Sequence, residues 1–154
     1  MFSIGDIIMC PTHGAGKIEN IEERDTSSGK VLYFDIRIIF GNMRVFIPCS
    51  SPALRPIISE KEAKAFLAAL KDIEITDNNN WSKRYRENAE RLRSGKIEDS
   101  ASVYKYLHLR SAEKGLSAGE RKMYQSVKGV IVSELMISLS VSMEEAERML
   151  LRAV

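Results

Sequence analysis

Short apolar runs separated by turn residues fill the first third of the chain, which is the pattern of a small β-sheet. Residues 26–29, Thr-Ser-Ser-Gly, are typical of a hairpin loop, and Gly41–Asn42 is typical of a tight two-residue turn. The expected strands cover residues 4–10, 16–23, 31–40 and 43–48. Four or five strands in so short a segment predict a strongly curved sheet or small barrel. Such a sheet has one hydrophobic face and an exposed edge that a partner could extend.

The rest of the chain follows a helical pattern. Ser59 and Glu62 form a capping box, and apolar residues then recur at helical spacing from Ala63 to Ile73. Two further capping signatures begin at Ser117 and Ser142. The expected helices cover residues 59 to about 73, 81 to 95, 99 to 115, 117 to 139, and 142 onward, with glycines at 95 and 115 ending two of them. Five helices joined by short loops predict a compact bundle.

The composition changes where the pattern changes. Residues 1–55 are rich in Ile, Val, Phe and Gly, whereas the remainder is rich in Ala, Leu, Glu, Lys and Arg. Pro48, Pro52 and Pro56 lie at the junction. We therefore expect an α+β protein with a small curved β-sheet or barrel over residues 1–55 and a five-helix bundle over residues 56–154.

Several classes of protein can be set aside from the composition. The chain has no apolar stretch of about 18 residues, the length that a membrane-spanning helix needs, and its N-terminus has no basic segment of the kind that starts a signal peptide. Two cysteines are too few for a disulfide scaffold and favour a reducing compartment. We expect a cytoplasmic protein without a membrane partner.

Signals for catalysis or metal binding are weak. Residues 14–17, Gly-Ala-Gly-Lys, resemble the end of a phosphate-binding P-loop, but Pro11 replaces the earlier glycine and Ile18 replaces the Ser or Thr that would bind magnesium. Cys10 and His13 have a metal-like spacing without a second close pair. The two histidines and the scattered carboxylates show no convergent acid–base set. We expect neither an enzyme nor a bound metal, cofactor or small-molecule substrate.

Positive charge is concentrated in the helical part, although the formal net charge of the chain is only +2. Residues 81–96 and 105–128 each carry six basic and two acidic residues, a net of +4, whereas segments 56–80, 97–104 and 129–154 are each −2. Arg121 and Lys122 lie in the first turn of an expected helix, where cations oppose the helix dipole. Two interpretations stay open: a solvated helix surface, or a phosphate-binding surface.

Trp81 is the only tryptophan, and it also has two interpretations. At helical spacing it shares a face with Tyr85, Ala89 and Leu92, which favours a core residue. Its polar approach, residues 77–80, and its basic neighbours favour exposure at the start of a helix. An exposed apolar side chain beside phosphate-binding cations is the arrangement of a minor-groove wedge.

These residues resemble the CarD/CdnL family of bacterial RNA polymerase-binding transcription factors along nearly the whole chain. The N-terminal signals are Gly5–Asp6 and then Pro11-x-His13–Gly14 with Gly16 and Ile18. The more specific series is Asn80–Trp81–Ser82–Lys83–Arg84–Tyr85, Leu92-x-Ser94–Gly95 and Gly115–Leu116–Ser117–Ala118–Gly119–Glu120. The resemblance implies a Tudor-like β module that docks on the polymerase β subunit. It also implies a helical module whose tryptophan wedges into promoter DNA at the upstream edge of the transcription bubble and hinders its closure.

The resemblance also assigns individual residues. The DNA-contacting residues are expected to be Trp81, Lys83, Arg84, Arg86, Arg121 and Lys122. On the polymerase side Arg24 matches a family arginine, Phe46 stands where the family has a second one, and Arg44 lies on the same strand face and can replace it. The alternative is a polymerase-interaction module without a role in DNA melting, as in transcription-repair coupling factors, which carry a motor whose ATPase motif is absent from this sequence. Nucleoid association is also expected.

Overall fold

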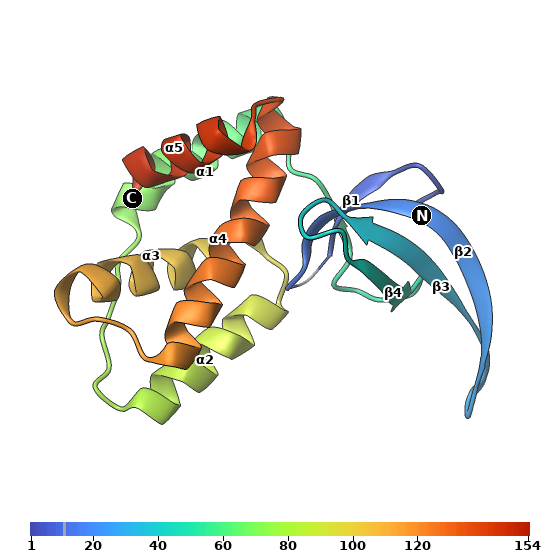
Figure 1. Ribbon diagram of the computed structural model, residues 1–154, viewed down its shortest axis with the longest axis horizontal. Coiled ribbons are helices and arrows are strands. Elements are labelled where there is room, and N and C mark those ends of the chain that lie inside the picture. The colour runs from blue at the N-terminus through green and yellow to red at the C-terminus, as the bar shows by residue number, and fades with distance from the viewer. Residues whose placement is uncertain (11) are drawn as a thin grey trace.

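The computed structural model describes residues 1–10 and 12–154, and its N-terminal part is a five-stranded antiparallel sheet (Figure 1). The strands are β1 (Ile7–Cys10), β2 (Gly14–Thr26), β3 (Gly29–Ile38), β4 (Arg44–Pro48) and β5 (Arg55–Pro56). Their order is β4-β3-β2-β1-β5, so β4 and β5 are the edge strands. The long β2–β3 hairpin curves away from the helices, and Ser27 and Ser28 form its turn, as predicted.

One face of the sheet carries a hydrophobic core. Ile18, Phe34 and Ile36 are fully buried on it, as period-two alternation of strand side chains requires. Gly16 leaves the space that this core fills, since a Cβ on Gly16 would lie 2.5 Å from Cγ2 of Ile36. The sheet therefore has the hydrophobic face that the short apolar runs predict.

The strand ends differ from the prediction for local reasons. β1 begins at Ile7 instead of residue 4 because Gly5, with φ of +96°, turns the chain just before it. β2 is longer than predicted because its polar end stays paired with β3 as far as Thr26 opposite Gly29. Pro11, which belongs to the N-terminal motif, lies outside the described residues.

The helices begin and end close to their sequence signals. They are α1 (Glu60–Ala69), a 3-10 turn η1 (Leu70–Asp72), α2 (Trp81–Arg93), α3 (Ile97–Glu113), α4 (Ala118–Leu139) and α5 (Met143–Ala153). Ser59 and Ser117 each form the full reciprocal capping box, whereas Ser142 only accepts a hydrogen bond from the backbone of Glu145. The α+β class, with the sheet before five α-helices, is confirmed.

α4 is the central helix of the second module (Figure 1). It packs against α1, α3 and α5, and Leu107, Ile131, Leu135 and Leu150 are fully buried in the shared core. α4 is 22 residues long. In the described parts of the chain no single helix, α4 included, is both long and apolar enough to cross a membrane. α4 and α5 together have sufficient length and apolar composition, but they meet at a bend of 111°.

The two modules are joined through α4. Arg55 in β5 forms two hydrogen bonds with the buried carboxylate of Glu134, at 2.6 and 2.8 Å. The backbone N–H of Ala15 in β2 donates to Ser133 Oγ at 2.9 Å. β5 spans residues 55–56, so the boundary expected between these residues falls inside a strand that pairs with β1.

Candidate nucleic-acid interface

Trp81 is the first residue of α2 and is 45% exposed. The side chain of Asn80 caps this helix by accepting a hydrogen bond from the backbone N–H of Lys83 at 3.1 Å. The cap ends the polar loop and places Trp81 on the first turn, at the margin of the bundle. The core interpretation of Trp81 is therefore wrong, and the exposed interpretation holds.

The indole of Trp81 is held from two directions. Its Nε1 donates to Ser117 Oγ at 2.9 Å, and its ring stacks on Tyr85 with centroids 5.5 Å apart and planes 22° from parallel. A stacked aromatic pair contributes about 0.5–1.5 kcal/mol beyond its buried area, and a hydrogen bond about 1 kcal/mol. Tyr85 packs closely against α4 at Gly119, where a Cβ would lie 3.4 Å from the tyrosine ring. The exposed indole therefore rests on a fixed support.

Arg84 lies under this support instead of on the surface. It is 8% exposed, and its guanidinium donates to both carboxylate oxygens of Glu120, at 2.9 and 3.1 Å. Its third nitrogen faces the carbonyls of residues 78 and 79 at 3.4 and 3.3 Å. The expected exposed cation at position 84 is thus a buried structural residue, because its side chain crosses from α2 to the start of α4.

Glu120 is the buried partner that anchors Arg84. Burial alone raises the pKa of its carboxyl, but hydrogen bonds from Arg84 and from the backbone and side chain of Ser117 outweigh burial, so the pKa lies below the ordinary value. Because Ser117 also accepts from Trp81 and caps α4, one side chain links the indole to this ion pair.

A second cluster fixes the loop before α2. Asp77 accepts hydrogen bonds from Tyr106, Arg110 and Lys114, at distances of 2.6 to 3.1 Å. The hydrogen bond from Lys114, then that from Tyr106, lowers the pKa of Asp77 well below its ordinary value. Two cations of the positive segment 105–128, Arg110 and Lys114, are therefore engaged in these contacts. Lys105 is a third, since its ammonium donates to the carbonyl oxygens of Leu70 and Lys71 in η1 and of Ile73 just after it.

Four of the expected cations remain exposed, namely Lys83, Arg86, Arg121 and Lys122. Lys83 reaches Glu87 only at 4.0 Å, and Arg121 donates to a backbone carbonyl at 3.2 Å. Arg86 and Lys122 form no ion pair within residues 1–10 and 12–154. We call these cations, together with Trp81, Tyr85 and Ser117, the tryptophan surface.

The three residues expected at the polymerase lie together on the sheet face opposite the core. The guanidinium of Arg24 in β2 lies 4.1 Å from the ring centroid of Phe46 in β4 and 5.5 Å from that of Tyr33 in β3. Arg44 approaches the same Phe46 ring at 6.0 Å and forms an ion pair with the buried Asp35. The hydrogen bond that Arg44 donates to the carboxylate of Asp35 raises the pKa of Arg44 above its ordinary value. We call Arg24, Tyr33, Arg44 and Phe46 the arginine–aromatic face.

The edge of β4 adjoins this face. β4 pairs with β3 on one side and has no strand on the other, within the part of the chain that the structure describes. Such an edge presents unpaired backbone N–H and C=O groups that a strand of another protein can extend. Of the two edge strands, β4 is the one that lies beside the arginine–aromatic face.

Two members of these surfaces were not expected from the sequence. Tyr33 joins the arginine–aromatic face only because β2 and β3 pair in the observed register, with Glu22 opposite Tyr33. Ser117 carried a capping signature, but no local pattern indicates that its hydroxyl also receives the indole of Trp81. Within the described residues, no group of three His, Cys, Asp or Glu side chains is placed to hold a metal ion.

Comparison with known proteins agrees with this two-module arrangement. Residues 2–59 match the CarD-like/TRCF RID domain, and residues 65–151 match the C-terminal domain of CarD. The chain is also 36% identical over 138 residues, 88% of this chain and 90% of the relative, to the Bacillus subtilis (strain 168) protein named "Putative transcription factor YdeB".

The fold and the matches define a bacterial transcription regulator that interacts with RNA polymerase. The chain belongs to the CarD family.

Proposed function

We propose that this protein docks on the β subunit of RNA polymerase through its arginine–aromatic face and stabilises the open promoter complex through its tryptophan surface. The observation that carries the DNA-binding half is Trp81, which is 45% exposed, supported by Tyr85 and Ser117, and followed along α2 by the exposed cations Lys83 and Arg86. A large apolar side chain exposed on a rigid support suits insertion at a base step.

The geometry suits a wedge that acts on DNA already opened. Unstacking a base step costs a few kcal/mol, which is more than a few exposed cations supply. A tryptophan that is already fixed loses little conformational freedom when it inserts. The surface would therefore bind the edge of a melted region better than intact duplex.

The cations of the tryptophan surface would position the wedge without reading sequence. If Lys83, Arg86, Arg121 and Lys122 each met one phosphate, the logarithm of affinity would fall with the logarithm of salt at a slope of about −3 to −4. Between 50 and 200 mM salt that slope reduces affinity by about a hundredfold. Binding to free DNA would then be weak, and promoter choice would rest with the polymerase.

Docking on polymerase would supply the missing affinity. Phe46 and Tyr33 offer aromatic area, Arg24 offers a guanidinium held by cation–π contacts, and the β4 edge offers backbone hydrogen bonds. Once docked, the tryptophan surface acts on promoter DNA at a high effective concentration. A preference of about 1.4 kcal/mol for the open over the closed complex shifts that equilibrium tenfold. Such a protein would reside with the nucleoid in the cytoplasm.

Two substitutions separate the halves of the proposal. Trp81→Ala should shorten the lifetime of open complexes after challenge with a competitor, while capture of the purified β subunit is unchanged. Arg24→Glu should abolish that capture. Leu151→Ala, at a residue that is 60% exposed on α5 and outside both surfaces, is the control and should change neither.

The results also test the alternative of a polymerase-interaction module without a role in melting. An unchanged open-complex lifetime in Trp81→Ala, with the protein bound, would establish that alternative and overturn the wedge. Full capture of the β subunit by Arg24→Glu would remove the arginine–aromatic face from the docking site.

A further inference from the structure

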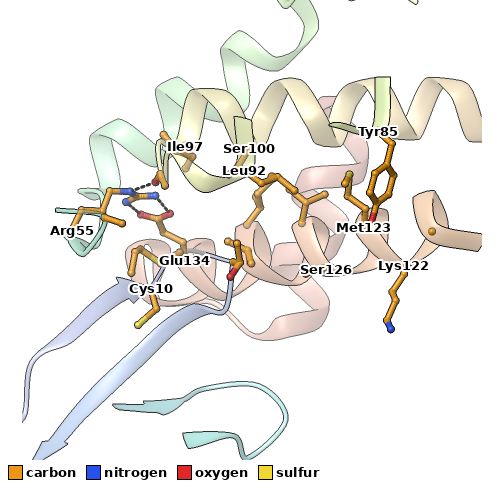
Figure 2. Close-up of a pocket in the computed structure, with 18 residues that line it drawn as sticks. Cys10, Arg55, Tyr85, Leu92, Ile97, Ser100, Lys122, Met123, Ser126 and Glu134 are labelled. Carbon is orange, nitrogen blue, oxygen red and sulfur yellow. Dashed lines mark hydrogen bonds and ion pairs between the residues drawn. The ribbon is translucent and has the colours of Figure 1, made fainter. Parts of the chain in front are cut away.

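A cavity of about 220 Å³ lies between the two modules. Its walls come from β1, the segment before β5, α2, the start of α3 and α4, and Figure 2 shows the lining side chains. An apolar cavity of roughly 150 Å³ already accepts benzene, so this space can hold a larger organic molecule. Neither the tryptophan surface nor the arginine–aromatic face needs such a space.

The two ends of the cavity differ in chemistry. At one end Arg55 and Glu134 pair with each other, and Glu134 also accepts from the backbone N–H of Ile58 at 3.0 Å (Figure 2). Figure 2 shows Tyr85 and Lys122 at the other end. The first end is electrically satisfied and has no free charge to offer to a ligand.

The second end has a cation without a partner. Lys122 forms no ion pair or side-chain hydrogen bond with any of the residues that the structure describes. Its flexible side chain can place the ammonium over the opening while the stem stays on the apolar wall. The same wall carries the hydroxyl of Ser126, which also has no hydrogen-bond partner among the described residues.

Between these polar groups the lining is largely apolar. It includes Leu92, Met123, Val127, Val130 and Ile131. Burial of an alkyl chain against such side chains is favourable by about 0.8 kcal/mol per CH₂ group. An apolar body with a single anionic head therefore matches the cavity and its opening.

We propose that this cavity binds a small amphipathic carboxylate of the medium-chain fatty acid class. The alkyl chain would lie among the apolar side chains, and the carboxylate would meet Lys122 and Ser126 at the opening. Tyr85 lines the cavity and stacks on Trp81, so the only tryptophan of the chain reports on occupancy. Tyr85 and Lys122 also belong to the tryptophan surface, but binding of the carboxylate can be measured on the free protein without DNA or polymerase.

Titration with sodium octanoate below its micelle-forming concentration tests the site. Calorimetry should show saturable binding of one octanoate per chain with a negative heat-capacity change, and the tryptophan emission should change over the same range. Octylammonium, with the same chain and the opposite charge, should bind more weakly. Lys122→Gln should weaken octanoate by about threefold to fivefold, the size of an exposed ion pair, and should reduce its advantage over octylammonium.

Ser126→Phe should fill the space and weaken octanoate more than tenfold. Gln125→Phe is the matched control, because Gln125 is exposed on the same helix and does not line the cavity. Methyl NMR of the unmodified protein is a second measurement that needs no folded variant, and shifts should centre on Leu92, Val127 and Val130. Absence of saturable binding, full binding by a folded Ser126→Phe variant, or shifts away from these methyls would each overturn the proposal.

Discussion

Replacing Glu120 with Gln removes a negative charge from the support beneath Trp81. Glu120 is fully buried and bonded twice to Arg84, which is itself 8% exposed. The guanidinium would stay buried with no opposite charge at hydrogen-bonding distance. Removing one partner of a buried ion pair costs about 3–5 kcal/mol, so Glu120→Gln should lower the free energy of unfolding by about 3 kcal/mol.

A double-mutant cycle isolates the ion pair from other losses. Arg84→Met removes the cation, and in the double variant Arg84→Met/Glu120→Gln the nearest remaining charge is Arg110, which lies 4.0 Å from Glu120 and keeps its ion pair with Asp77. Replacing both charges of a buried pair is much less damaging than replacing one. The double variant should therefore lose about 2–3 kcal/mol less than the sum of the single losses, a coupling in the range of direct contacts. Urea unfolding followed by circular dichroism measures all four free energies.

The dependence of the free energy of unfolding on acid pH is an independent test of the Arg84–Glu120 ion pair. The folded protein holds the pKa of Glu120 below its ordinary value of 4.5. The carboxylate therefore contributes stability that is fully present above about pH 4.5 and is lost as the pH falls through the lower folded pKa. In Glu120→Gln the free energy of unfolding should therefore fall less as the pH is lowered. The decrease due to Asp77, whose pKa is also lowered in the folded protein, should remain.

Three outcomes would contradict the assignment of Arg84 and Glu120 as a buried ion pair. A loss below 1 kcal/mol for Glu120→Gln would mean that water reaches Arg84. Additive single losses in the cycle would mean that the two side chains do not interact. An unchanged acid dependence in Glu120→Gln would mean that Glu120 has an ordinary pKa in the folded protein.

Other sites support two further predictions of stability. Arg55→Ala leaves the carboxylate of Glu134, which is 1% exposed, without its cation. The free energy of unfolding in urea should fall by about 3 kcal/mol. A fall below about 1 kcal/mol would contradict the contact between the modules. Gly14→Ala should cost about 1–3 kcal/mol, because φ is +97° and a Cβ would lie 2.8 Å from Ser133 Oγ. Gly129 lies in α4 with open space around it, so Gly129→Ala should instead raise the free energy of unfolding by about 0.5–1 kcal/mol. Equal changes in Gly14→Ala and Gly129→Ala would contradict both expectations.

Elements with local signals could be predicted from the sequence. The capping boxes at Ser59 and Ser117 locate helix starts because the bonds that form them lie within four residues. The turn residues 26–29 locate the β2–β3 hairpin for the same reason. β5 has only two residues and forms because β1 supplies its partner, so no local pattern marks it.

The candidate site shows the limit of such signals. Positive charge along the sequence indicated α2, α3 and the start of α4 as a candidate surface, yet it did not distinguish Arg86 on the surface from Arg84 and Lys105 in buried contacts. That distinction depends on which acidic or carbonyl group another helix brings near. Trp81 was ambiguous for the same reason, since helical spacing gives the face of a residue but not where the bundle ends.

Photo-crosslinking from position 81 in assembled open complexes shows whether Trp81 contacts promoter DNA at the edge of the bubble. A benzophenone amino acid at position 81 replaces the indole with a side chain of similar reach, and the same substitution at the exposed Leu151 serves as the control. Our account predicts crosslinks from position 81 to promoter DNA at the upstream edge of the bubble, and none to DNA from position 151. Crosslinks from position 81 to polymerase alone, in complexes that retain the protein, would contradict it.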